Sequence, residues 1–254
     1  MDINKLKIEK FYCGDMPTEA QAALAKMLEG ENLGISYADM MRYRVSNQAA
    51  GECNDTYFVA HKDGIAYSRL WNGWGKHNGA IGNFGNFVTL EDVRGQGLGH
   101  RMLEFWFEDV SNRTDLPLCF LCMGDKRAAK LYFPYGFQTI EKDARWGPLF
   151  MPLGDSPTDF RELCDLYYQP SDTLFRRSAT LEWRHEIDCL LKYSLWSMGL
   201  DYTIDGKILE QALLYSPDSA ELLFTEGGRC VGWMLEGEVK VHPMYIKSEI
   251  IKPQ

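Results

Sequence analysis

The chain has 254 residues, which suffices for one large domain or two small domains with cores of their own. Charged residues make up 25% and hydrophobic residues 45%, a composition that excludes a wholly disordered chain. The 36 acidic and 27 basic side chains give a net charge of −9, which argues against a general binder of nucleic acids or anionic membranes. We therefore expect neither a nucleic-acid partner nor a membrane partner.

The first seven residues carry charges where a signal peptide needs an apolar stretch. The longest apolar run, residues 116–123, is far shorter than the roughly 20 residues of a membrane-spanning helix. The seven cysteines do not have the spacing of a disulfide framework, and their odd number leaves one over. These features predict a cytoplasmic protein.

The predicted elements up to the first hairpin begin with a strand at residues 6–11 and a helix at 17–30. A second helix, with Met40, Met41 and Tyr43 near its middle, and two strands at 57–60 and 65–71 follow. Pro17 and Thr18 favour a helix start, and Gly30 favours its end. The Asp63-Gly64 pair is typical of the tight turn that joins two antiparallel strands.

Strands and helices alternate in the next part of the chain. The predicted order is strand, helix, strand, helix and strand, at residues 79–90, 97–112, 118–123, 126–133 and 137–140. Asp125 is the expected N-cap of the second of these helices, and Pro134 and Gly136 end it. A βαβαβ order predicts a mostly parallel sheet with right-handed crossovers.

The pattern changes at residues 154–157, where we place a boundary between a first domain (1–153) and a second domain (154–254). Apolar residues at helical spacing predict helices first, and the tail then becomes a β-meander. The three predicted meander strands are residues 221–225, 230–235 and 238–242. The second domain is therefore expected to be a smaller α+β domain, and its role is not legible in the sequence.

Three glycines lie in the segment Arg94-Gly95-Gln96-Gly97-Leu98-Gly99, between a predicted strand and a predicted helix. Glycine allows positive φ, so several N–H groups can point at one centre, and the helix N-terminus adds unpaired N–H groups and partial positive charge. The spacing differs from the dinucleotide fingerprint and lacks the Lys-Ser/Thr of a P-loop. The segment predicts a pyrophosphate site to which Arg94 adds a charge-assisted contact; a turn without a ligand is the alternative.

This segment resembles the Q/R-x-x-G-x-G/A pyrophosphate loop of the GNAT superfamily of N-acetyltransferases. Residues 124–137 are similar to a second signature of that superfamily, N-x-x-A-x-x-L-Y-x-x-x-G-F, with Asp125 in the place of Asn. The resemblance covers about residues 6–150. It implies an α/β fold in which a central mixed sheet is flanked by helices.

The resemblance also implies the activity: transfer of an acetyl group from acetyl-CoA to a small-molecule or peptide amine, by direct attack on the thioester and without a metal. The strands at residues 84–90 and 118–123 would part, and the pantetheine arm would insert between them. The CoA-binding residues implied are Phe87, Val88, Thr89, Arg94, Gly95, Gln96, Gly97, Leu98, Gly99, His100, Asp125 and Ala128.

Tyr132 occupies the general-acid position of the superfamily, and the backbone N–H of Val88 is the implied oxyanion donor. The alternative for Tyr132 is an aromatic residue packed in the core. The strand before the loop offers Asn83 and Asn86, neither of which can act as a general base. No general base is assigned, and a water chain is as plausible as a side chain.

Two other interpretations remain open. In one, the first domain is a non-catalytic module that binds CoA or interacts with a partner. In the other, the second domain is the active part and the first domain is a sensor. Lys126, Arg127 and Lys130 form either a solvated helix face or a contact to the 3′-phosphate of CoA. The sequence does not decide whether the chain forms a homodimer.

Overall fold

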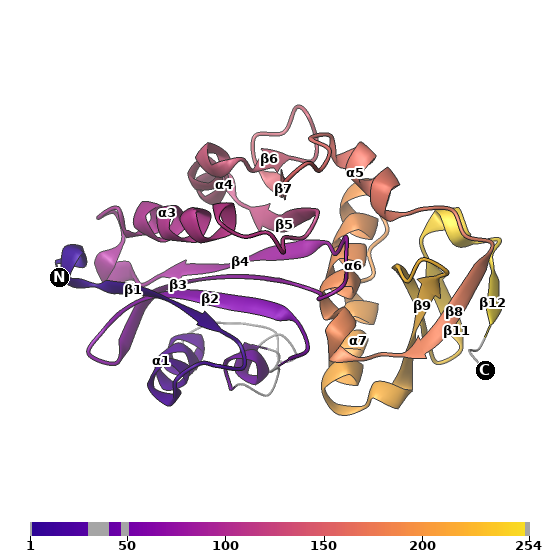
Figure 1. Cartoon of the computed structure of the whole chain (residues 1–254), viewed down its shortest axis with the longest axis horizontal. Helices are drawn as coiled ribbons and strands as arrows, with labels where there is room; N and C mark the ends of the chain where they lie inside the picture. The colour runs from indigo at the N-terminus through magenta and orange to yellow at the C-terminus, as the bar shows by residue number, and fades with distance from the viewer. Residues whose placement is uncertain (1, 30–40, 47–50, 252–254) are drawn as a thin grey trace. The chain divides into compact units, whose positions relative to one another are not determined.

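A computed structural model of the chain describes residues 2–29, 41–46 and 51–251. The chain divides into two compact units, Met1–Ser156 and Pro157–Gln254. Each unit has its own β-sheet (Figure 1). Of the helix predicted around residues 40–43, residues 41–45 are helical, and Met40 lies outside the described residues.

The first unit is built on a seven-stranded mixed sheet in the order β1-β2-β3-β4-β5-β7-β6 (Figure 1). Its strands are β1 (Lys7–Tyr12), β2 (Asn54–Lys62), β3 (Ile65–Trp74), β4 (Gly82–Thr89), β5 (Cys119–Gly124), β6 (Gln138–Thr139) and β7 (Gly147–Pro152). This sheet and its flanking helices confirm the predicted fold class.

The expectation of a mostly parallel sheet is wrong. Only β4 and β5 run parallel, and the other neighbouring pairs are antiparallel. The cause is β7, which was not predicted: it lies between β5 and β6 and pairs antiparallel with both. A proline near each end of its short apolar run hides this strand in the sequence.

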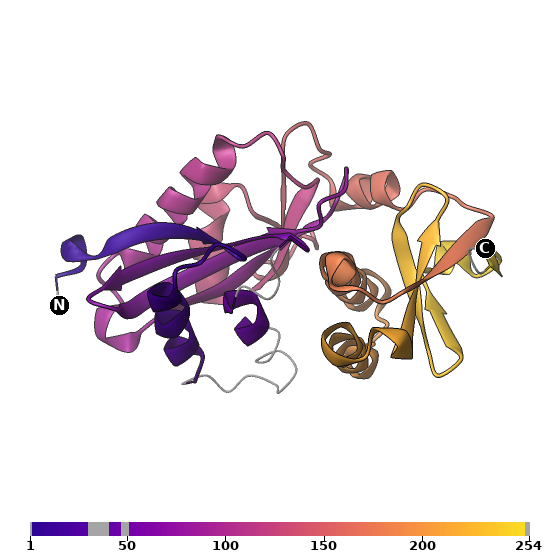
Figure 2. The ribbon, with the colours of Figure 1, turned by 60° about the horizontal axis from the view of Figure 1, so that its bottom comes forward.

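Helices cover both faces of this sheet (Figures 1 and 2). The helix α1 (Thr18–Glu29) lies on one face, and α3 (Leu98–Ser111) and α4 (Lys126–Tyr132) lie on the other. Side chains of β2 alternate between the two resulting cores, because successive residues of a strand point to opposite faces. Phe58 packs in the core under α3, whereas Tyr57 and Val59 pack in the core under α1.

The second unit has a five-stranded sheet in the order β11-β10-β9-β8-β12. Its helices are α5 (Phe160–Tyr167), α6 (Arg184–Met198) and α7 (Thr203–Tyr215), and its strands are β8 (Thr173–Ser178), β9 (Ala220–Thr225), β10 (Cys230–Leu235), β11 (Glu238–Val241) and β12 (Glu249–Ile251). Figure 2 shows α6 and α7 side by side on one face of this sheet.

The predicted order of helices followed by a meander is incomplete. The three meander strands are present as β9, β10 and β11, but β8 precedes α6 in the chain and pairs with β9. The last strand, β12, pairs parallel with β8 and was also not predicted. No helix in the described part of the chain is long and apolar enough to cross a bilayer.

Gly232 of β10 has no room for a side chain. A Cβ there would lie 2.4 Å from the carbonyl oxygen of Lys240 and 2.9 Å from the Cα of Val241, both backbone atoms of β11. We expect Gly232→Ala to destabilise the second unit by about 2 kcal/mol, because the strands must move apart. The denaturant midpoint, followed by circular dichroism, measures this loss. Gly227→Ala is the control, since its Cβ would meet only the Thr225 side chain, at 3.8 Å.

Asp125 caps α4, as predicted: its Oδ1 accepts hydrogen bonds from the N–H groups of Arg127 at 2.8 Å and Ala128 at 2.7 Å. These backbone bonds hold the pKa of Asp125 below its usual value. We expect Asp125→Ala to cost about 1 kcal/mol at neutral pH and Asp125→Asn to cost much less, because asparagine also caps helices.

The pH dependence of this stabilisation has a definite sign. A carboxyl with a lowered pKa contributes stability above its unfolded pKa of about 3.9, and that contribution is lost as the pH falls through the lower folded value. The stability difference between wild type and Asp125→Ala should therefore shrink in denaturation curves below about pH 4. An unchanged difference at acid pH would contradict the capping role of the charge.

Candidate functional site

The strand β4 carries a bulge near its C-terminal end. Two of its residues, Asn86 and Phe87, stand opposite a single residue of β3. Asn86 takes a positive φ of 51°, and its side-chain nitrogen Nδ2 lies 3.2 Å from the sulfur of Met41. A bulge bends a strand and changes the direction of the residues that follow it.

Beyond the first residues of β4, β4 and β5 are no longer paired. Their parallel register joins Gly82 and Asn83 with Phe120 and Leu121 only. From there to its end β4 stays paired antiparallel with β3, with the register shifted at the bulge. The side of β4 that faces β5 is therefore an open strand edge, and an extended ligand can bind such an edge through backbone hydrogen bonds.

The register decides which peptide groups face this edge. Val88 pairs with Arg69 of β3, and its carbonyl accepts a hydrogen bond from Ser68 Oγ at 3.0 Å. Because peptide groups alternate sides along a strand, those of Phe87 and Thr89 face the open edge. Phe87 and Thr89 are two of the three residues predicted to pair with the pantetheine arm, which stays a prediction. The same alternation turns the Val88 N–H toward β3, so its role as oxyanion donor stays a prediction that this register does not favour.

The glycine loop that follows β4 is open. Gly95 and Gly97 have φ values of 73° and 89°, and a Cβ added to either would meet no atom within 4 Å. Gly97 is the N-cap of α3, and its carbonyl accepts the N–H of Arg101. The N–H groups of the first turn of α3 have no partner within the helix, as at any helix start. They are thus placed to bind an anion.

Side chains of the loop form hydrogen bonds with its backbone. The Nε of Arg94 donates to the Thr89 carbonyl at 2.7 Å, and its Nη1 lies 3.2 Å from a carboxylate oxygen of Glu91. Gln96 donates from Nε2 to the carbonyl of Asp92 at 3.2 Å. Arg94 and Gln96, both predicted to contact CoA, therefore also fix the shape of the loop before any ligand arrives.

A pocket of about 600 Å³ surrounds the loop. Its lining comprises Thr89, Val93, Arg94, Gly95, Gly97, Leu98, Gly99, His100, Arg127 and Leu131. Seven of these are predicted CoA-binding residues. Sequence reasoning missed Val93 and Leu131, which form the apolar wall; Leu131 lies three residues after Ala128, on the same face of α4, and that helical spacing was the available signal.

Basic side chains extend this pocket along α4. A second pocket of about 690 Å³ is lined by Asp125, Lys126, Arg127, Lys130 and Trp146. Arg127 borders both pockets, so cationic groups continue from the glycine loop to the exposed ring of Trp146. The predicted residues Asp125 and Ala128 lie beside them, with the Ala128 N–H occupied by the cap of α4.

Tyr132 lies at the end of α4 and is only 5% exposed. Its ring stacks on that of Phe87 with centroids 6.3 Å apart and packs against Phe137 at 5.5 Å. Burial, with smaller contributions from Cys122 and Asp125, raises the pKa of its hydroxyl, which therefore keeps its proton at neutral pH. That hydroxyl has no hydrogen-bond partner among the described residues, so it is available as a donor.

Part of the first unit matches a known protein family. A family model described as "Acetyltransferase (GNAT) domain" matches residues 53–139. No curated protein matches the chain. The chain is similar to a solved acyl-CoA N-acyltransferase from Pseudomonas aeruginosa, with 20% identity and a TM-score of 0.42 over 59% of this chain and 100% of that one.

Two further solved structures with bound ligand are similar to the chain. A GNAT family N-acetyltransferase from Escherichia coli in complex with CoA is 15% identical, with a TM-score of 0.43 over 59% of this chain and 83% of that one. A predicted acetyltransferase from Clostridium acetobutylicum with acetyl-CoA is 17% identical, with a TM-score of 0.40 over 52% and 90%. The family model ends well before the second unit. Within the first unit, residues 53–139 therefore match the family model of the GNAT acetyltransferase domain.

Proposed function

We propose that the chain is an N-acetyltransferase that transfers the acetyl group of acetyl-CoA to an amine. The observation that carries this proposal is the union of two features: an open glycine loop at the start of α3 and the unpaired edge of β4. The first suits a pyrophosphate and the second suits an extended amide-bearing chain. CoA contains both groups, and the GNAT family match supports this choice.

Both backbone groups and side chains contribute to the proposed binding of CoA. The N–H groups of the first turn of α3, which include those of Gly99 and His100, receive the pyrophosphate, and Arg127 adds positive charge from α4. The peptide groups of Phe87 and Thr89 pair with the pantetheine arm. The Thr89 carbonyl already accepts from Arg94, so the Phe87 peptide carries more of this pairing.

The chemistry needs one bond made and one broken. The amine nitrogen, after losing its proton, attacks the thioester carbonyl, a C–N bond forms and the C–S bond breaks. The departing sulfur gains from a proton or a hydrogen bond, because a thiolate has a conjugate-acid pKa of about 8.5. The protonated hydroxyl of Tyr132 is the proposed donor. No side chain is assigned as the base that takes the amine proton.

The acceptor is a small-molecule or peptide amine, and a direct assay tests the whole proposal. The protein is mixed with acetyl-CoA and a panel of amines, and free thiol is followed over time. Thiol release that depends on an amine supports the enzyme. Thermal stabilisation by CoA without turnover on any amine would instead favour a CoA-binding module. The absence of both would refute the CoA site itself.

We expect Tyr132→Phe to lower kcat by roughly 10- to 100-fold, because removal of a hydrogen bond to a charged group costs about 1.5–3 kcal/mol. The affinity for CoA, measured by calorimetry, should stay within about twofold of wild type, since the ring is retained. Tyr12→Phe on β1 makes the same chemical change outside the site and should leave kcat unaltered. Equal kcat values for the two variants would remove Tyr132 from its role.

We expect Gly97→Ala to weaken CoA binding by roughly 5- to 30-fold. An alanine at a φ of 89° is strained by about 1–2 kcal/mol, and relief of that strain turns the loop N–H groups away from their common centre. Gly154→Ala is the matched control, because Gly154 also has positive φ and open space around it but lies outside the loop. If both variants bind CoA as wild type does, the loop does not hold the pyrophosphate.

A further inference from the structure

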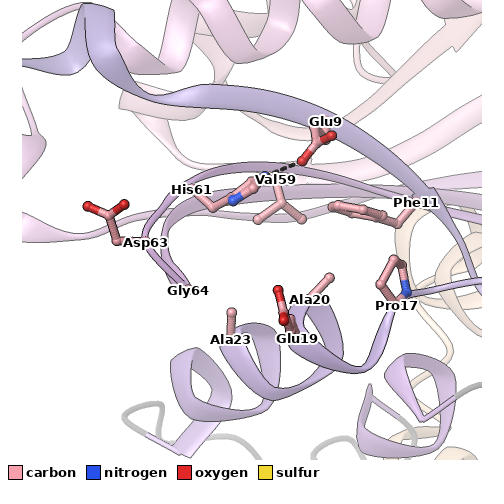
Figure 3. Close-up of a pocket in the computed structure, with 10 residues that line it drawn as sticks. All are labelled: Glu9, Phe11, Pro17, Glu19, Ala20, Ala23, Val59, His61, Asp63 and Gly64. Carbon is pink, nitrogen blue, oxygen red and sulfur yellow. Dashed lines mark hydrogen bonds and ion pairs between the residues drawn. The ribbon is translucent and has the colours of Figure 1, made fainter.

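A cavity of about 410 Å³ lies between α1 and the sheet of the first unit. Figure 3 shows side chains of α1, among them Ala20 and Ala23, across an open space from Phe11 of β1 and Val59 of β2. The alanines explain the space, because side chains of this size on the sheet-facing side of a helix leave the gap between helix and sheet unfilled.

The cavity combines an apolar floor with an acidic rim. Phe11, Val59 and Ala20 supply apolar surface, whereas Glu9, Glu19 and Asp63 bring carboxylates from three different elements. This lining has no Lys or Arg side chain. Such a lining favours a ligand with a positive charge at one end and a hydrocarbon body.

The acidic groups differ in how far they are already paired. Glu9 contacts Lys7 and His61, and the Lys7 ammonium, as the leading cause, lowers its pKa, so it is anionic at neutral pH. The ammonium of Lys62 is 3.9 Å from Asp63. Glu19 has no ion-pair partner among the described residues. It is therefore the carboxylate with most of its charge available to a ligand.

The register separates this cavity from the CoA site. Glu9 pairs with Val59, Val59 with Arg69 and Arg69 with Val88, so three strand spacings lie between β1 and β4. At about 4.8 Å per spacing, this is roughly 14 Å within the sheet. The cavity is also on the α1 face, whereas the glycine loop leads into α3 on the opposite face. The two sites have separate linings.

We propose that this cavity binds a small organic cation, an ammonium or guanidinium group carried on a short hydrocarbon chain. The charged end meets Glu19 and Glu9 at the rim, and the chain covers Phe11 and Val59. The inference rests on the cavity alone and does not depend on acetyl transfer. It places a second ligand site in the domain, next to the Asp63-Gly64 hairpin turn.

The test uses n-hexylammonium as the probe, titrated into the full chain with binding followed by NMR chemical shifts or calorimetry. We expect saturable binding, at least about tenfold tighter than that of 1-hexanol and of hexanoate, because only the ammonium complements the rim. Saturating CoA should leave the affinity unaltered. Equal affinities for the three probes, or displacement by CoA, would overturn the proposal.

Variants of α1 locate the binding. Glu19→Gln should weaken binding of the probe by about fivefold, and Ala20→Leu, which fills the cavity, should abolish it. Ala22→Leu makes the same change on the exposed side of α1 and should bind as wild type does. Circular dichroism of each variant confirms that the first unit is folded. Retained binding in folded Ala20→Leu contradicts this site.

Discussion

The parting of β4 from β5 is the constraint on which the rest of the site depends. An interior strand normally pairs its backbone on both sides, and unpaired peptide groups need another partner. Here the pairing ends at Asn83, the bulge at residues 86–87 turns the strand, and the loop that follows delivers the free N–H groups of α3. A strand edge with unpaired peptide groups and a helix N-terminus that favours an anion thus occur within one short stretch of chain.

Charged side chains are distributed unevenly over the first unit. The chain as a whole carries −9, yet the side chains that border the loop and its neighbouring pocket include Arg94, Arg127, Lys126 and Lys130. Three carboxylates, those of Glu9, Glu19 and Asp63, line the cavity beside α1. A field screened over about 10 Å is set by near neighbours, so a negative net charge does not prevent a phosphate site. The net charge of the sequence argued against general nucleic-acid binding, and it had no bearing on this local pattern.

Features set by local chemistry could be predicted from the sequence, and features set by distant pairing could not. The Asp63-Gly64 turn has positive φ at both residues, as its composition indicates, and Asp125 caps its helix. The glycines of the loop could be identified as a candidate pyrophosphate site because their spacing indicates the backbone conformation there. By contrast, β7, β8 and β12 pair with strands far along the chain, and the bulge exists only relative to β3. The direction of the Val88 N–H follows from that register, which no motif encodes.

The burial of Tyr132 is compatible both with packing in the core and with the hydrogen-bond donor role that we propose for it. Its ring packs on Phe87 and Phe137, as a core aromatic does, and this packing fixes the side chain next to Phe87 of β4. The same burial raises its pKa above 10, whereas a thiol has a pKa of about 8.5. Complete proton transfer from this hydroxyl to a thiolate is therefore uphill in the free protein. A strong hydrogen bond to the departing sulfur is not uphill, because it needs the proton to stay on the oxygen. On this argument the role we propose for Tyr132 is that of a fixed hydrogen-bond donor to the leaving group, with solvent supplying the proton that completes the thiol.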